Sequence, residues 1–455
     1  MTVRAPDVRD VSLALPLAGA LLIPMLPLVV QLADIFPAGV AILGRGVAVA
    51  LVVVLGVAGL ASMASILIKH GWHKVRRAPL AKPLLVLIAT QAIAAIIGVS
   101  FRAGEFEILS QIGDVIAFLT FWFTMAKRGA RRAFLACFFL SGIAACVYAI
   151  ALTLSRHPPA AFAYEHGRAA GTFLQPNELA GYLLFLIPLG LAQIAAPLWL
   201  RRLGFAAAVV GGAALVLSVS RAAWLGLLLA LPIFTARLGR RALAGYAVAA
   251  LILLTLGATV LRNVAHDPSE NTSRITVWRS AIRMAERFGL TGLGPVAFGR
   301  VYPMLKEPDA INDVLHAHNL LLNVFIENGI IGFAAFIWVI VASVRAARHA
   351  GKQIPSADRE RVLLFSSLST AFAASAVQNS IDLITTFVLL LWWPMLGLML
   401  ALARDERTGA NSSEHASQNS PSTSPMRPPA LHLITAVCTI SAVASMLGAC
   451  GKGNA

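Results

Sequence analysis

Long apolar runs recur along this chain and constrain its fold more than any other feature. Each run is about 20 residues long, which is the length an α-helix needs to cross the hydrocarbon core of a bilayer. We predict twelve membrane-spanning segments, at 11–32, 47–68, 83–101, 106–126, 133–154, 178–200, 203–220, 221–236, 242–261, 319–344, 362–381 and 384–403. Between the seventh and the eighth, the chain must turn very tightly at Ser218–Arg221. The predicted fold class is an all-α polytopic membrane protein.

Composition supports this class, because 58% of the 455 residues are hydrophobic and only 13% are charged. In soluble domains about a quarter of the residues are charged. The predicted organisation is a cytoplasmic N-terminus (1–10), a multi-helix membrane domain (11–403), a disordered polar linker (404–430) and an apolar C-terminal segment of unassigned role (431–455). Within the membrane domain, 262–318 forms one long loop, in which we expect short amphipathic helices.

The net charge of +16 could indicate a nucleic-acid partner, but its distribution favours membrane lipids. Lysine and arginine concentrate in alternate loops, at 69–82, 127–132, 237–241 and 345–361. Such alternation marks cytoplasmic loops, which face anionic headgroups. The pattern predicts that the N-terminus and Arg404 are cytoplasmic and that the long loop is on the outer side. We expect no nucleic-acid partner.

Two outer stretches carry candidate substrate groups. In GRAAGTFLQPNELAGY (167–182), Asn177 either caps a helix that begins at Glu178 or binds substrate. In SVSRAAWLG (218–226), Arg221 stands at the outer membrane boundary. There it either reaches the headgroups or binds an anionic substrate.

The long loop contains SRITVWRSAIRMAERFGLTGLGPVAFG (273–299), which begins as an amphipathic helix with Ser273 as a plausible N-cap. One face of this helix is apolar, and it carries Ile275, Trp278, Ile282 and Ala285. Another face is basic, and it carries Arg279, Arg283 and Arg287. The helix either lies along the bilayer with its arginines at the headgroups, or provides a cationic wall for a phosphate-bearing lipid.

Two histidines, His316 and His318, precede an apolar helix that runs from 319. With only Asp309 and Asp313 nearby, they lack the three or four ligands at regular spacing that metal sites show, so we expect no metal and no cofactor. His318 alone is better placed as a general base, because the positive end of the following helix disfavours the imidazolium form.

These residues together resemble the O-antigen ligases and the related O-antigen polymerases. His318-Asn319, nine residues, Gly329, two residues and Gly332 follow the ligase signature. GTFLQPNELAGY resembles the family's Pro-Asn segment, SRAAWLG its Ser-Arg segment, and SRITVWRSA…GLGPVAFG the two ends of its catalytic outer loop. The resemblance spans roughly 167–335, and the polymerases share much of it.

The resemblance implies an enzyme of the bacterial inner membrane with its active site in a periplasmic loop. Such enzymes transfer a glycan from undecaprenyl diphosphate to a hydroxyl of lipid A–core or of another lipid-linked glycan. The implied catalytic residues are His318, Arg221 and Arg274, with the arginines gripping the diphosphate in place of a metal. Asn177, Arg279, Arg283 and Asn319 are the expected substrate-binding residues.

A polytopic transporter or flippase for a lipid-linked or small polar substrate is the alternative. Transporters carry polar residues near the membrane midplane. The candidates here are Gln31, Gln91, Asp114, Gln193 and Gln378. Asp114, which has no obvious partner in the sequence, is the best reason to keep this alternative. A site at the outer boundary favours the enzyme.

Overall fold

The structure is a computed structural model that describes residues 11–22, 24, 38–155, 167–173, 175–248, 250–251, 269–310, 313–383 and 386–404. Over these residues the regular secondary structure is helical, without strands, as the sequence predicts. The helices are η1 (Val11–Leu13), α1 (Ala14–Leu22), α3 (Ala38–Arg76), α4 (Ala81–Ile97), α5 (Phe101–Thr124), α6 (Arg128–Leu154), α8 (Pro176–Ala192), η3 (Gln193–Ala195), α9 (Leu198–Ser218), α10 (Arg221–Leu238), α12 (Ser269–Phe288), α13 (Phe298–Leu305), α14 (Leu320–Gln353), α15 (Arg359–Ile381) and α16 (Thr386–Ala401).

By length and composition, seven helical segments in this part of the chain could cross a membrane. They are Val53–Arg76, Arg128–Leu154, Pro176–Ala195, Leu198–Ser218, Arg221–Leu238, Leu320–Gln353 and Arg359–Ile381. Three apolar helices are shorter, at Val11–Leu22, Ala81–Ile97 and Leu391–Ala401. The predicted spans 11–32 and 242–261 run into residues outside the described part, so the count of twelve stays a prediction.

The predicted boundary between the spans 178–200 and 203–220 is wrong. The span predicted at 178–200 ends earlier, because α8 stops at Ala192 and α9 starts at Leu198. Pro197 is the N-cap of α9. Proline has no backbone N–H to donate within a helix, so it interrupts one apolar run and starts the next.

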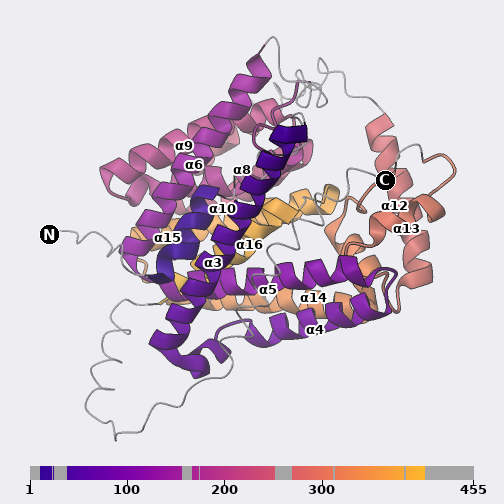
Figure 1. Cartoon of the computed structure of the whole chain (residues 1–455). Coiled ribbons are helices and arrows are strands. Elements are labelled where there is room, and N and C mark those ends of the chain that lie inside the picture. The colour runs from indigo at the N-terminus through magenta and orange to yellow at the C-terminus, as the bar shows by residue number, and fades with distance from the viewer. Residues whose placement is uncertain are drawn as a thin grey trace, which may run out of the picture.

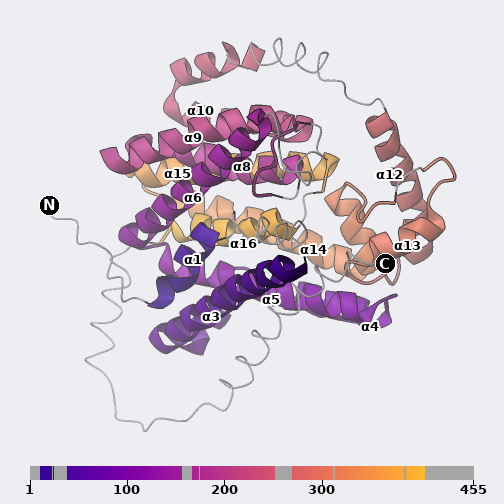
Figure 2. The same cartoon turned by 45° about the horizontal axis from the view of Figure 1, so that its top comes forward.

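The buried helix α8 lies at the centre of the larger hydrophobic core. Its sequence is apolar on all sides, as expected of a helix surrounded by others. This core joins α8 to α1, α6, α9, α10, α15 and α16. A second core joins α3, α4, α5 and α14, and α16 contributes to both. Figures 1 and 2 show the resulting bundle.

The long loop forms a third small core beyond one end of the bundle, where Figures 1 and 2 show α12 and α13 past the ends of α4 and α5. The predicted amphipathic helix exists, but it begins at Ser269, so Ser273 lies inside it and is not its N-cap. Its buried face carries Val277, Ala281 and Met284. The predicted apolar face is largely left outside the protein core, since Ile275 and Ile282 are half exposed.

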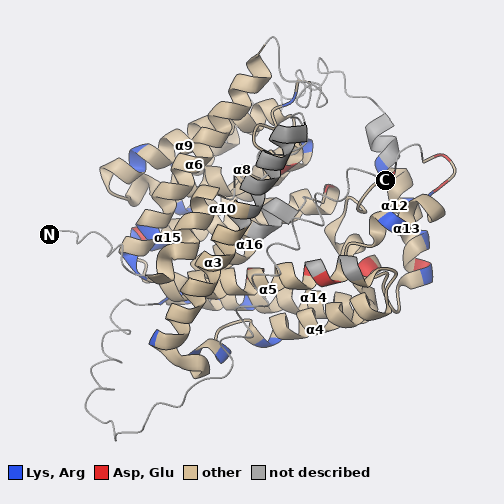
Figure 3. Ribbon diagram, viewed as in Figure 1, with Lys and Arg blue, Asp and Glu red and all other residues tan. Residues whose placement is uncertain are grey.

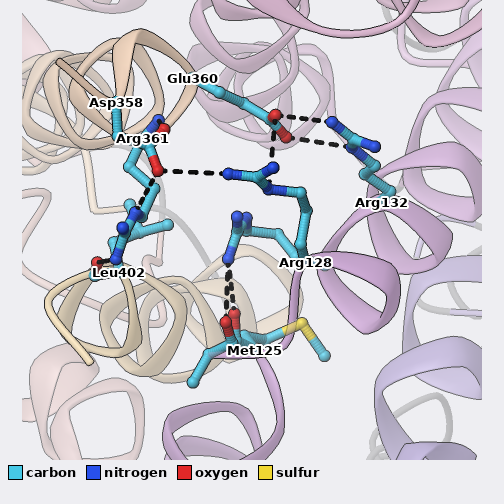
Figure 4. A network of polar contacts seen from close by, with 9 residues as sticks. Met125, Arg128, Arg132, Asp358, Glu360, Arg361 and Leu402 are labelled. Carbon is cyan, nitrogen blue, oxygen red and sulfur yellow. Dashed lines mark hydrogen bonds and ion pairs between the residues drawn. The ribbon is translucent and has the colours of Figure 1, made fainter. Parts of the chain in front are cut away.

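Basic residues gather at the two ends of the bundle (Figure 3). At the end away from α12, two of the predicted cytoplasmic loops meet in an ion-pair network (Figure 4). There Arg132 holds Glu360 through two nitrogens, at 2.7 and 3.2 Å, and Arg128 lies 3.3 Å from Asp358. Arg361 also binds Asp358, at 2.7 Å. The network joins the starts of α6 and α15.

Candidate active site

Asp382, at the C-terminal end of α15, is the residue on which the candidate site groups converge. Its carboxylate is buried, with 7% of the side chain exposed. Oδ1 lies 2.7 Å from Nδ1 of His318, and Oδ2 lies 3.3 Å from an Nη of Arg274. Oδ2 also accepts a hydrogen bond from Nδ2 of Asn177. Three residues predicted from separate sequence segments therefore meet at one carboxylate.

The carboxylate of Asp382 needs these partners. The residue is the C-cap of α15, and its backbone N–H donates to Gln378 O at 2.8 Å. The C-terminal end of a helix carries partial negative charge, which disfavours a nearby carboxylate. Burial acts to raise the pKa of Asp382, but the hydrogen bond from His318 and the charge of Arg274 outweigh it, so the pKa lies below its usual value. The group is ionised at neutral pH.

His318 is held in an unusual backbone conformation at the start of α14. Its φ of +50° lies in the left-handed region, which is strained for a residue other than glycine. Asn319 follows as N-cap and accepts a hydrogen bond from Leu322 N at 3.0 Å. The Asn319 side chain also donates to Ser380 O at 2.8 Å, which ties the start of α14 to the end of α15. A substrate-binding role for Asn319 stays a prediction.

The imidazole of His318 is arranged to accept a proton. Ionised Asp382 can only accept hydrogen bonds, so His318 Nδ1 must carry the hydrogen in the contact between them. Nε2 then has a free lone pair, in a side chain that is 25% exposed. A carboxylate that fixes the tautomer and orientation of a histidine is the arrangement of general-base catalysts.

His316 lies beside this pair without joining it. Its ring centroid is 4.5 Å from that of His318, and its Nδ1 accepts the His318 backbone N–H at 3.3 Å. Burial, with the nearby His318, lowers the pKa of His316 to about 4. The ring is therefore neutral at pH 7. No group of three or more His, Cys, Asp or Glu side chains suited to a metal ion occurs within the described ranges.

Asn177 does not cap its helix. α8 begins at Pro176, two residues before the predicted start at Glu178, and its N-cap is Gln175. Proline favours the first helical position because its φ is preset. Asn177 then falls in the first turn, and its side chain bridges Asp382 and Arg168, whose Nη2 donates to Asn177 Oδ1 at 3.1 Å. Arg168 is not among the sequence-predicted site residues.

The tight turn predicted before Arg221 is confirmed. α9 ends at Ser218, Val219 adopts a left-handed φ of +51°, and Arg221 is the first residue of α10. Arg168 Nε donates to Ser218 O at 3.0 Å, so this turn lies at the same end of the bundle as Asp382. Arg221 is thus placed near the site, half-buried at a helix N-terminus.

The other predicted arginines of α12 point elsewhere. Arg279 is exposed. Arg283 is more than half exposed and lies 2.9 Å from Glu307. The described contacts bring Arg274 alone, from this helix, to Asp382. Substrate-binding roles for Arg279 and Arg283 stay predictions.

Gly329, one of the two glycines of the His318 signature, allows the helix after His318 to pack closely against the loop after α12. Gly329 kinks α14 with a φ of +64°. The loop after α12 forms backbone hydrogen bonds with α14 on both sides of this kink. Ile330 N donates to Gly289 O at 2.7 Å, and Leu293 N donates to Ile326 O at 3.0 Å. A Cβ on Gly329 would lie 2.7 Å from Leu290 O, so a side chain does not fit. The kink anchors the outer loop to the helix that follows His318.

Asp382 is not among the site residues predicted from the sequence. The predicted span 362–381 ends one residue before it, so an acidic residue directly after an apolar segment was the available signal. That signal is weak by itself, because an acidic residue directly after a membrane segment can equally be exposed to water without any function. What identifies Asp382 is its contact with a histidine 64 positions away in the chain.

The fold defines a multi-pass helical membrane protein, with a histidine–carboxylate pair and arginines at one end of its bundle. A family model described as O-Antigen ligase matches residues 206–337, and this confirms the resemblance to the O-antigen ligase family. The match includes Arg221, Arg274 and His318, and it supports glycan transfer of the ligase or polymerase type in general. No curated protein matches the chain.

Proposed function

We propose that the protein transfers a glycan from undecaprenyl diphosphate to an acceptor hydroxyl, at the periplasmic face of the bacterial inner membrane. The observation that carries this proposal is the His318–Asp382 pair with Arg274 at the same carboxylate. It gives one oriented base and a fixed cation at the end of a membrane bundle. A lipid-linked donor and a hydroxyl acceptor, either lipid A–core or another glycan, fit that combination.

In the proposed reaction, His318 Nε2 takes the proton of the acceptor hydroxyl. The acceptor oxygen forms a bond to the anomeric carbon of the glycan, and the bond from that carbon to the phosphate oxygen breaks. Its electron pair leaves with undecaprenyl diphosphate. Asp382 stabilises the imidazolium that forms, and the proton later passes to solvent or to the leaving group.

The diphosphate gains negative charge as it leaves, and fixed cations aimed at that charge are the largest contribution a protein makes. Arg221 and Arg274 are the proposed cations. Arg274 can meet the diphosphate only with the part of its guanidinium that Asp382 does not use. Arginine suits the role, since its planar fork holds phosphate oxygens bidentately. With the charge met by arginine, we expect a chelator to leave transfer unchanged.

The test supplies purified protein with a lipid-diphosphate glycan and each candidate acceptor, and measures which acceptor gains sugar. We expect transfer to one class of hydroxyl acceptor, with free undecaprenyl diphosphate as the second product. Movement of the intact donor across a vesicle membrane without transfer would instead support the flippase alternative. Loss of transfer in EDTA, restored by added metal, would overturn the proposed role of the arginines.

The arginines give a second test of the same proposal. Arg221→Ala and Arg274→Ala should each abolish or strongly reduce transfer while the protein stays inserted and abundant. Lysine at either position should be nearly as damaging, because it keeps the charge but not the fork. Arg287→Ala is the matched control from the exposed side of α12 and should tolerate the change. If the control variant loses more transfer activity than Arg274→Ala, the residues proposed to bind the diphosphate are wrong.

Two mid-membrane glutamines of the transporter alternative have structural hydrogen bonds. Gln193 Nε2 donates to Leu189 O at 2.8 Å, one turn earlier in the same helical segment. Gln378 Nε2 donates to Asn177 O at 2.9 Å and so fixes the backbone beside the proposed site. Both glutamines therefore have structural partners, and Asp114 stays the residue that favours the transporter alternative.

A further inference from the structure

Arg168 contacts Asn177 rather than Asp382 or His318. It precedes a short segment anchored in the core, where Ala169 and Phe173 are fully buried and Ala169 N donates to Leu217 O at 2.9 Å. Its Nε donates to Ser218 O, the last residue of α9. Carbonyls at helix C-termini lack partners within the helix and favour a cation. The position of the Arg168 guanidinium is therefore set by the backbone of α9.

The other contact of this guanidinium is with the Asn177 amide, and it favours the same orientation as Asp382 does. Arginine can only donate hydrogen bonds, and an ionised carboxylate can only accept them. Because Arg168 Nη2 faces Asn177 on one side, Oδ1 must be the atom turned toward it, at 3.1 Å. Nδ2 is then the atom turned toward Asp382 Oδ2. The amide is therefore held from both sides in one orientation.

We propose that Arg168 is a positioning residue for the transfer, acting through Asn177 on the Asp382–His318 pair. This inference rests on the proposed function. The four side chains form one chain of hydrogen bonds, in which Arg168 donates to Asn177, Asn177 donates to Asp382, and Asp382 accepts from His318. Without Arg168, Asn177 Oδ1 loses its donor, and the contact with Asp382 holds the amide alone. The Asn177 side chain is then less fixed, and the Asp382 carboxylate that it positions can shift away from His318.

Arg168 carries no carboxylate partner among the described residues, so a direct contact with the donor diphosphate is the competing explanation. The two explanations differ in kinetics. A positioning residue lowers kcat and leaves the KM for the donor nearly unchanged, whereas a residue that binds donor and transition state equally raises KM. The two explanations also differ in whether the effect of replacing Arg168 depends on the presence of the Asn177 side chain.

The experiment is a double-mutant cycle on the purified full chain in the transfer assay, with Arg168→Met, Asn177→Ala and the double variant. We expect Arg168→Met to lower kcat about 10- to 100-fold, the loss that a small misplacement of a catalytic group produces. The donor KM should change less than about twofold, in contrast to a uniform-binding loss. In the Asn177→Ala background, Arg168→Met should have no further effect, because coupled residues are not additive. Arg201→Met, on an exposed arginine of α9, is the matched control and should behave as wild type.

A second readout does not depend on transfer. Proton NMR of the full chain in detergent should show a low-field resonance from the His318 Nδ1–H bound to Asp382, identified by its loss in Asp382→Ala. That resonance should weaken or disappear in Arg168→Met, return partly in Arg168→Lys, and persist in Arg201→Met. If it is unchanged in Arg168→Met, the positioning role is wrong. Additive kcat losses or a raised donor KM overturn it as well. Wild-type protein that keeps the resonance but transfers no glycan would contradict the proposed function and leave the structural coupling standing.

Discussion

At the scale of single residues, the site depends on a few side chains whose charge states are set by their neighbours. Asp382 is buried yet ionised, because His318 and Arg274 stabilise its negative charge. His316 is adjacent but neutral, since burial and the nearby His318 disfavour its protonated form. Two histidines two positions apart therefore have different surroundings.

Replacing His318 should remove the chemical step without removing substrate binding. General-base catalysis contributes about 10²- to 10⁴-fold, so His318→Ala should lose transfer to that extent. Binding of the lipid-diphosphate donor should remain, because the arginines are untouched. His349→Ala, an exposed histidine on α14, is the control and should keep full activity. Full activity in His318→Ala, measured by single-turnover transfer, would contradict the base assignment.

His316 should make the protein less stable in mild acid. Its pKa is about 4 in the folded protein, against the ordinary value of 6.5. Between these values the unfolded chain binds a proton that the folded chain does not, so stability falls as the pH drops from about 6.5 toward 4. His316→Gln cannot be protonated, and we expect a smaller drop in Tm between pH 7.5 and pH 5 in detergent. An unchanged drop would show that other groups cause it.

At the scale of helices, the functional end is organised by backbone contacts between elements. The turn from α9 to α10, the start of α8 and the end of α15 are joined by Arg168 and Asn177. The kink at Gly329 joins the loop after α12 to α14. The opposite end of α15 is tied to α6 by the Arg132–Glu360 ion pair. α15 therefore links the candidate site to the end of the bundle that holds this ion pair.

Adding one methyl group at the kink should detach the outer loop. Gly329 has a positive φ, and a Cβ there would lie 2.7 Å from Leu290 O and 2.8 Å from Gly292 N. Gly329→Ala should cost about 1–3 kcal/mol through backbone strain, and more through the clash. Transfer should fall with it, because the same loop follows the helix that carries Arg274. Gly212→Ala, in α9 with open space around its Cβ position, is the control and should change neither Tm nor transfer.

At the scale of the whole molecule, the ion-pair network and the candidate site lie at opposite ends of α15. The loops at 127–132 and 345–361 meet near the start of α15, and Asp382 follows the end of that helix. Its 23 residues correspond to about 34 Å of helix, close to the thickness of a bilayer. With the positive-inside rule, this separation favours a cytoplasmic network and a periplasmic site.

Reporter fusions test this orientation directly. Fusions near Gly129 and Gly351 should report the cytoplasm, and a fusion near Gly292 should report the periplasm. The reason is that the first two positions lie in basic loops, whereas the third lies in the loop beside the candidate site. Alkaline phosphatase and a cytoplasmic fluorescent reporter give opposite readouts at each position. A cytoplasmic signal near Gly292 would place the site on the wrong side for a periplasmic lipid-linked donor.

Much of the fold followed from local sequence, and part of the site did too. Apolar length predicted the helices, and the tight turn at 218–221 was placed correctly because two apolar runs left no other room. Boundaries set by proline were less accurate, as at Pro176 and Pro197. Of the predicted site residues, His318, Arg274 and Asn177 meet at one carboxylate. The match to the O-antigen ligase model supports the segment that the signature indicated.

Local sequence was enough to determine the class of protein and to indicate the segment in which we propose its chemistry. A bilayer selects helices by local apolar length, and membrane orientation depends on the charge of short loops, so neither needs tertiary contacts. Only the tertiary structure identified Asp382 and Arg168 and showed that Asn177, predicted either to cap a helix or to bind substrate, bridges these two side chains. These roles arise from hydrogen bonds between helices far apart in the chain. No local sequence pattern predicts the packing that brings together the ends of α8, α9, α14 and α15. In the sequence, each of these ends is a short polar stretch next to an apolar segment, as at the end of most membrane helices.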